Sequence, residues 1–196
     1  MIQQTKSKVL TTSQEVLAEV RIKGKLLMQF LRRSESHIKF DGTASKEAKW
    51  LLVDRVPSVA ILVCDRRHNL ILVEQFRAPE MVNTLEIPAG SMEKGGDALA
   101  TAIEEVQQET GLEVKELLKV GEFILSPGGS SEKISIFFAL VDDLGQDGEL
   151  NGLAEENENI KKHIVPFSEA KKMCQTGQLY DAKTVLALQW FELNRI

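Results

Sequence analysis

The chain has 196 residues, of which 43% are hydrophobic and 27% are charged, so it carries enough apolar side chains for a sizeable core. Its formal net charge of -5 argues against a broad phosphate-binding surface, so nucleic acid is not an expected partner. We expect a cytoplasmic protein without a membrane partner. No apolar run reaches the roughly 20 residues of a membrane span, and the N-terminus lacks an apolar signal-peptide core. The only cysteines, Cys64 and Cys174, lack metal-type spacing and are expected to be buried thiols in a reducing compartment.

The N-terminal region is predicted to form a small antiparallel β unit over about residues 1–50. Residues 15–31 alternate loosely around Lys23-Gly24-Lys25, which indicates a hairpin or two sequential strands, although the run LLMQFL also fits a helical turn. A short strand at 37–40, a turn at Asp41-Gly42 and the run WLLVD within 46–54 complete this unit. Residues 51–196 are expected to form the main domain.

Beyond residue 50, apolar runs of strand length alternate with polar turns. The run SVAILVC at 58–64 is continuous, as expected of a strand buried on both faces, and LILVEQ follows at 70–75. Further strands are predicted at 117–125, 134–141 and 160–166, and helices at 168–176 and 181–194. An acidic loop rich in glycine and asparagine spans 142–159. This mixture predicts an α/β or α+β fold in which helices cover a mixed sheet.

The stretch LEIPAGSMEKGGDALATAIEEVQQETGLEV, residues 85–114, combines a short apolar run, a glycine-rich turn and a helix. Asp97 is placed to cap the start of the helix, and Gly111 is placed to end it. Glu105 and Glu109 are four residues apart, so both carboxylates leave one face of the helix one turn apart. Such a pair suits a hard divalent cation. The simpler alternative is a solvated acidic face.

This stretch resembles the Nudix box, which runs G-x5-E-x7-R-E-u-x-E-E-x-G-u, where u is an aliphatic residue. The positions that fit the box are Gly90, Glu105, Val106, Glu109, Gly111 and Leu112. Three positions depart from it: Gly96 and Gln108 stand where glutamates belong, and Glu104 stands where an arginine belongs. Pro127, fifteen residues beyond Leu112, is placed as in the ADP-ribose diphosphatase branch. The resemblance extends over about residues 55–190.

The resemblance implies an α+β protein, an α/β/α sandwich with a Nudix-like mixed sheet, preceded by the small N-terminal β unit. It also implies Mg²⁺-dependent hydrolysis of ADP-ribose or a related nucleoside diphosphate sugar, with Mn²⁺ as an alternative ion. By the same resemblance, Glu105 and Glu109 are the metal ligands and catalytic acids, joined by the Ala89 carbonyl. In the acidic loop, Glu156 is the candidate general base and Glu158 an additional metal contact. The alternative for both loop acids is simple solvation.

Other residues are candidates for holding the substrate. Arg77 is a candidate diphosphate contact and Arg55 a weaker one, although either could be a surface ion-pair residue. Trp50 could stack on a nucleobase or belong to the core. Glu132 and Pro127 match the loop of the branch, where Lys133 replaces an arginine. The branch also implies a homodimer, with the N-terminal strands contributing to the partner's substrate site.

The three departures leave a second hypothesis open. Gln108 has a neutral amide oxygen and cannot supply anionic charge to a metal. Glu104 in place of arginine removes a cation that would orient the neighbouring acids. The alternative to an enzyme is therefore a catalytically impaired Nudix-fold protein that binds nucleotide sugars without turnover.

Overall fold

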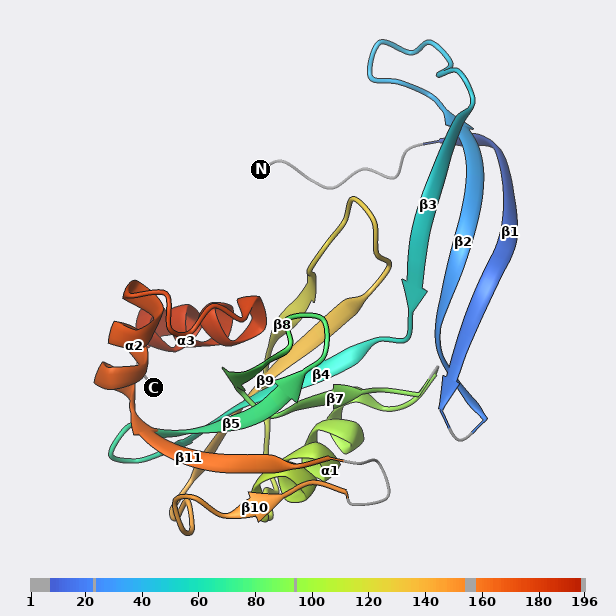
Figure 1. Cartoon of the computed structure of the whole chain (residues 1–196). Helices are drawn as coiled ribbons and strands as arrows, with labels where there is room; N and C mark the ends of the chain where they lie inside the picture. The colour runs from blue at the N-terminus through green and yellow to red at the C-terminus, as the bar shows by residue number, and fades with distance from the viewer. Residues whose placement is uncertain (1–7, 23, 94, 154–157, 195–196) are drawn as a thin grey trace. The chain divides into compact units, whose positions relative to one another are not determined.

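The computed structural model describes residues 8–22, 24–93, 95–153 and 158–194 (Figure 1). Its contacts divide the chain into two compact units. Unit 1 comprises Met1–Val56 and Ser126–Glu132, and unit 2 comprises Pro57–Leu125 and Lys133–Ile196. Each unit is considered by itself below.

Unit 1 contains an antiparallel three-stranded sheet in the order β1-β2-β3. The strands are β1 (Val9–Ile22), β2 (Lys25–His37) and β3 (Ala48–Arg55). The predicted N-terminal β unit is confirmed, whereas the helical alternative for LLMQFL is wrong because this run lies within β2 and pairs with both neighbours. The segment 126–132 belongs to this unit because it hydrogen-bonds along β3, with Val53 N donating to Gly129 O at 2.8 Å.

Unit 2 is built on a mixed sheet in the order β10-β11-β5-β4-β9-β8, in which β6 also pairs with β5 and β7 with β4. The pair β4–β9 is parallel and the other pairs are antiparallel. The strands are β4 (Ser58–Asp65), β5 (Asn69–Arg77), β6 (Val82–Glu86), β7 (Ala89–Ser91), β8 (Leu118–Ile124), β9 (Lys133–Val141), β10 (Leu150–Asn151) and β11 (Ile160–Pro166). The short strands β7 and β10 fall in segments that the sequence predicted as a turn and a loop.

Three helices cover the two faces of this sheet, α1 (Ala98–Thr110) on one and α2 (Phe167–Gln175) with α3 (Ala182–Asn194) on the other (Figure 1). Side chains alternate along β4, so Leu62 packs in the cluster that includes Phe191 of α3, while Ile61 packs with Val106 of α1. Both faces of β4 are therefore buried, which explains its continuous apolar run. The predicted α+β fold with a mixed sheet is confirmed.

Two smaller expectations concern the thiols and the membrane. Cys64 is buried in β4, and burial raises the pKa of its thiol to about 12, so it is inert as a nucleophile. Cys174 in α2 is only half-buried, so the prediction of a buried thiol is wrong there.

None of the helices in the described part of the chain is long and apolar enough to cross a membrane.

Candidate active site

Helix α1 begins and ends where the sequence predicted. The Asp97 carboxylate accepts a hydrogen bond from Leu99 N at 2.8 Å, which satisfies a free amide of the first turn. Gly111 ends the helix in the left-handed conformation, with φ 74°. Between these caps the apolar face of α1 packs on the sheet, which fixes where the acidic side chains of the same helix lie.

Glu109 lies near the end of α1 and is only 2% exposed. Its Oε2 accepts a hydrogen bond of 2.9 Å from Ala89 N in β7. Burial, together with the negative charges of Glu105 and Glu158, raises the pKa of the Glu109 carboxyl to about 8, although the hydrogen bond from Ala89 and the charge of Arg77 act to lower it. Three carboxylates thus lie near one another around a buried position where negative charge is unfavourable.

The carboxyl group of Glu105 lies directly against the backbone of Gly90. A Cβ atom at Gly90 would stand 1.9 Å from Glu105 Oε1 and 2.0 Å from its Cδ, so only glycine leaves room for this carboxylate. The first glycine of the Nudix-like stretch therefore has a steric role. It lets a helix carboxylate approach the strand β7.

We expect Gly90→Ala to lower catalytic activity by roughly 10²-fold, because the added methyl group displaces the Glu105 carboxylate by about an ångström or more. The melting temperature should change little, since the clash involves the far end of a flexible side chain and Gly90 has no left-handed φ. Steady-state kinetics and thermal melting measure the two effects separately. Full activity in a folded Gly90→Ala protein would show that the position of Glu105 does not matter.

Glu158 is held beside this helix by the ends of the acidic loop. Its Oε2 accepts a hydrogen bond from Leu153 N at 2.9 Å, and its own N–H donates to Leu153 O at 3.2 Å. Gly152 N in turn donates to the Gln108 carbonyl at 3.0 Å, which satisfies one of the free carbonyls at the end of α1. Glu158 is therefore tied to the end of α1. Glu156, the candidate base, lies outside the described residues.

The donor chemistry of this cluster fits a divalent cation. The carboxylates supply hard oxygen ligands, and a cation would compensate the repulsion that raises the pKa of Glu109. Within the described ranges, however, no three Asp, Glu, His or Cys side chains already stand at metal-binding spacing. Glu105 and Glu109 are the candidate ligands that the helix itself places together.

Arg77, the predicted diphosphate contact, is engaged within unit 2. Its Nε and Nη2 each donate a 2.6 Å hydrogen bond to Glu86, so the two side chains form a bidentate pair. The Glu109 charge is also close enough to raise the pKa of Arg77, after the larger effect of the Glu86 hydrogen bonds. Arg77 is therefore a fixed cation beside the carboxylate cluster. Its role toward a substrate stays a prediction.

Glu86 and Lys183 are buried charged residues that were not predicted from the sequence. Lys183 of α3 contacts Glu86 and also forms an ion pair of 3.0 Å with Asp181. Burial by itself would raise the pKa of the Glu86 carboxyl, but Arg77 and Lys183 outweigh it and lower the value to about 2. A charged residue inside the run LEIP was the only available signal for Glu86. No local pattern pointed to Lys183.

The remaining candidates for substrate binding lie in unit 1. Arg55 forms a 3.4 Å ion pair with Glu132, and Trp50 donates from its indole Nε1 to Glu35 at 3.2 Å. Pro127 belongs to the segment that runs along β3. The structure thus brings Arg55 together with Glu132, and it brings Arg77, Glu105 and Glu158 each within electrostatic range of Glu109. The roles of these residues stay predictions.

Comparison with known proteins gives the class to which this fold and site belong. Residues 54–190 match the NUDIX domain model. An ADP-ribose pyrophosphatase from Escherichia coli (strain K12) is 35% identical over 164 residues, 81% of this chain and 78% of that protein. A GDP-mannose pyrophosphatase from Cronobacter sakazakii is 35% identical over 150 residues, 73% and 77% of the two chains.

A solved crystal structure of an ADP compounds hydrolase has the same fold. It is similar with a TM-score of 0.65 over 98% of this chain and 95% of the other, at 16% identity. Helix α1 with its acidic residues packs on a mixed sheet, and residues 54–190 match the family model. The predicted resemblance to the Nudix family is therefore confirmed. The chain belongs to the Nudix family. Nudix hydrolases generally need a divalent metal ion, in agreement with the donor set around Glu109.

Proposed function

We propose that the protein hydrolyses the diphosphate bond of ADP-ribose, in a Mg²⁺-dependent reaction that yields AMP and ribose 5-phosphate. The observation that carries this proposal is the buried Glu109 carboxyl with Glu105 and Glu158 beside it and Arg77 within electrostatic range. At the level of class, a Nudix hydrolase of nucleoside diphosphate sugars, the prediction is confirmed by the family match and the relatives.

The residues would act in the following way. Water attacks one phosphorus of the diphosphate, and the bond from that phosphorus to the bridging oxygen breaks. Glu105 and Glu109 would hold a Mg²⁺ or Mn²⁺ ion through their carboxylate oxygens, with the Ala89 carbonyl and Glu158 as further ligands. When bound, the ion would supply charge neutralisation and polarisation of the diphosphate. Glu156 accepts the proton of the attacking water.

The N-terminal part, residues 1–50, is proposed to mediate homodimerisation and to help bind the substrate of the domain 51–196. Every residue of β1 is exposed, including Val16, Val20 and Ile22 at 46%, 38% and 51%. A strand that exposes several large apolar side chains is typical of an interaction surface. Arg77 of unit 2 is proposed to contact the diphosphate. In unit 1, Arg55, Trp50, Glu132 and Pro127 are proposed as further substrate-binding residues. The free thiols favour a cytoplasmic location.

The test is a substrate panel with metal titration. We expect AMP and ribose 5-phosphate from ADP-ribose in the presence of Mg²⁺, with activity removed by EDTA and restored by Mg²⁺ or Mn²⁺. Alkaline phosphatase releases inorganic phosphate from both products but not from ADP-ribose, so coupled phosphate release reports the reaction. GDP-mannose is the second substrate to compare. Ligand binding by calorimetry without turnover of any nucleotide sugar would instead support the alternative of a non-catalytic binding protein.

A further inference from the structure

Lys162 is a fully buried lysine at a position of β11 where the strand pattern favours an apolar residue. Ile160 and Ile164, two residues to either side, pack in the cluster that includes Val106 of α1, so alternation along the strand places Lys162 on the same face. A buried ammonium group is unfavourable unless it is paired and hydrogen-bonded, and an apolar side chain would fill this position without that cost. The packing of the sheet therefore does not explain this lysine.

The ammonium group of Lys162 joins two segments that lie far apart in the sequence. Its Nζ donates a hydrogen bond of 3.1 Å to the carbonyl oxygen of Thr110, the last residue of α1. It also forms an ion pair with Glu149, directly before β10. Gly145 closes over the same atom, since a Cβ atom at Gly145 would stand 3.0 Å from Nζ. Lys162 therefore holds the beginning of the acidic loop against the end of the helix.

Helix α1 has no cation of its own at this end. The last carbonyl groups of a helix lack partners within it and carry partial negative charge, so a positive group beside them is stabilising. The last turn of α1, residues 107–110, lies within the described part of the chain and contains no lysine, arginine or histidine. Lys162 provides the cation from β11 instead. With the hydrogen bond from Gly152 N to Gln108 O, it fixes the turn that carries Glu109.

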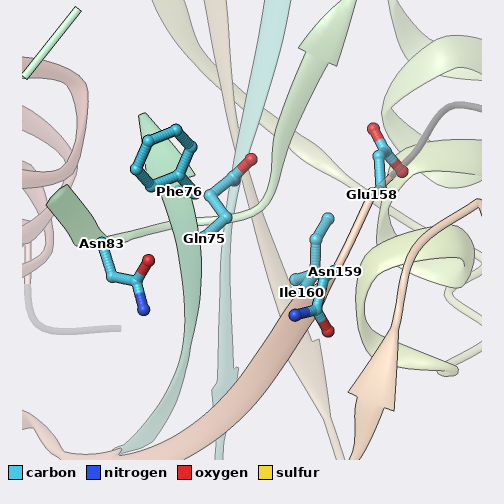
Figure 2. A pocket seen from close by; sticks show the side chains of 6 residues that line it. All are labelled: Gln75, Phe76, Asn83, Glu158, Asn159 and Ile160. Carbon is cyan, nitrogen blue, oxygen red and sulfur yellow. The ribbon is translucent and has the colours of Figure 1, made fainter. Parts of the chain in front are cut away.

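The same contacts extend to Glu158 through the pairing of β10 with β11. Lys162 N donates to Glu149 O at 2.9 Å, which continues the ladder between these two strands. Glu158 lies just before β11, where Figure 2 shows it ahead of Ile160 at the edge of a cavity. The segment that carries Glu158 is therefore attached, through Lys162, to the helix turn that carries Glu109.

We infer that Lys162 is a positioning residue, which holds the last turn of α1 and the acidic loop in the one arrangement that directs Glu109 and Glu158 to the same metal ion. The inference rests on the proposed metal-dependent hydrolysis. Lys162 acts through the Thr110 carbonyl and the Glu149 carboxylate. Because a displacement of about 1 Å in a catalytic group can lower a rate by roughly 10²-fold, loss of these contacts affects the reaction even when the fold is kept.

The experiment replaces Lys162 by methionine, which has a similar length and no charge. In Lys162→Met the Thr110 carbonyl loses its donor, while Glu149, whose side chain is 40% exposed, is hydrated. We expect the dissociation constant for Mn²⁺, measured without substrate by electron paramagnetic resonance, to rise about 10-fold. We expect kcat for ADP-ribose to fall about 10-fold with KM changed less than about twofold. Lys171→Met, which breaks the ion pair between α2 and α3, is the matched control and keeps the wild-type values.

A second pair of variants tests the same contact from the loop, and it decides the question if Lys162→Met does not fold. In Gly145→Ala the added methyl group displaces the ammonium group by a few tenths of an ångström, so we expect kcat and Mn²⁺ affinity to fall about 2- to 3-fold. Gly148→Ala is the matched control. Both glycines are exposed and left-handed, with φ +71° and +79°, but a Cβ atom at Gly148 would meet nothing within 4 Å.

The outcomes separate a positioning role from a purely structural one. A lower melting temperature in Lys162→Met, with wild-type kcat and wild-type Mn²⁺ affinity, would overturn the inference. Equal losses in the two lysine variants, or in the two glycine variants, would do the same. If the wild-type protein hydrolyses no nucleotide sugar, the proposed function fails, and the Mn²⁺ affinities still decide whether Lys162 positions the carboxylates.

Discussion

Glu109→Gln is expected to abolish hydrolysis and, at the same time, to stabilise the metal-free protein above neutral pH. Glutamine has nearly the same shape and its amide oxygen can still accept the hydrogen bond from Ala89 N. It cannot supply an anionic ligand to a cation, so we expect kcat to fall by about 10³-fold or more. The gain in stability arises because the buried negative charge is removed.

The direction in which stability changes with pH follows from the pKa values of Glu109 in the folded and unfolded states. Its folded-state pKa is about 8 and its ordinary value is 4.5, so between these values the metal-free folded protein binds a proton that the unfolded chain has lost. The stability of the wild-type protein therefore falls as the pH rises from about 4.5 to 8. Glu109→Gln lacks this loss, and at pH 8 we expect it to be more stable by about 4 kcal/mol, roughly 8–16 °C in Tm.

Thermal melting in EDTA at pH 5, 7 and 9 measures this effect, and repeating it with Mg²⁺ shows whether the ion restores stability to the wild-type protein alone. Glu113→Gln changes an exposed acid just beyond the same helix and serves as the matched control. A wild-type Tm in EDTA that does not vary with pH relative to Glu109→Gln would contradict the assignment of Glu109 as a buried acid of the metal site.

Glu86→Gln is expected to give the largest loss of stability, about 3–5 kcal/mol at pH 7. Glu86 is 3% exposed and its carboxylate contacts both Arg77 and Lys183. Removing its charge leaves Lys183 paired with Asp181, and it frees Arg77, which lies within electrostatic range of the Glu109 carboxylate. We therefore expect a fall in catalytic activity as well. Urea denaturation gives the free energy of unfolding.

The same residue should account for part of the acid sensitivity. The pKa of Glu86 is lowered from 4.5 to about 2, so its contribution to stability is present above pH 4.5 and is lost as the pH falls toward 2. The Glu86→Gln variant should not show this loss of stability between pH 4.5 and 2. Glu122→Gln, which breaks the exposed pair with Lys133, is the matched control and should cost less than about 1 kcal/mol. Equal losses for the two variants would contradict a structural role for the buried network.

The three departures from the Nudix box lie at different distances from the carboxylates of the candidate site. Glu104 is exposed, while Glu105 and Glu109 on the same helix face Gly90 and Ala89 of β7. Gln108 is half-buried, and its backbone carbonyl binds Gly152 at the start of the acidic loop. Gly96 lies in the turn before the helix, where its N–H donates to Glu93 O. The two central carboxylates thus keep their setting although three charged positions of the motif are changed.

Features that depend on neighbouring residues were predictable from the sequence. Asp97 and Gly111 bound α1 as expected, because capping requires only the residues of the adjacent turn. The apolar run of β4 correctly indicated a strand buried on both faces. The spacing of Glu105 and Glu109 placed them on one helix face. The β unit was predicted with one open alternative, since a short apolar run fits either a strand or a helical turn.

The tertiary structure decided what these residues do in their setting. Only packing could bury Glu109 at 2% exposure, press Glu105 against Gly90, and bring Lys183 to Glu86 across 97 residues of sequence. The Nε2 donor of Gln75, which has no partner among the described residues, likewise depends on which strands surround it. The helices and most of the strands were predictable from the sequence because they follow from local periodicity and capping, and the family was predictable because residues 85–114 resemble the Nudix box. Burial and charge compensation arise between distant segments, so the environment of Glu105 and Glu109 depends on the tertiary structure.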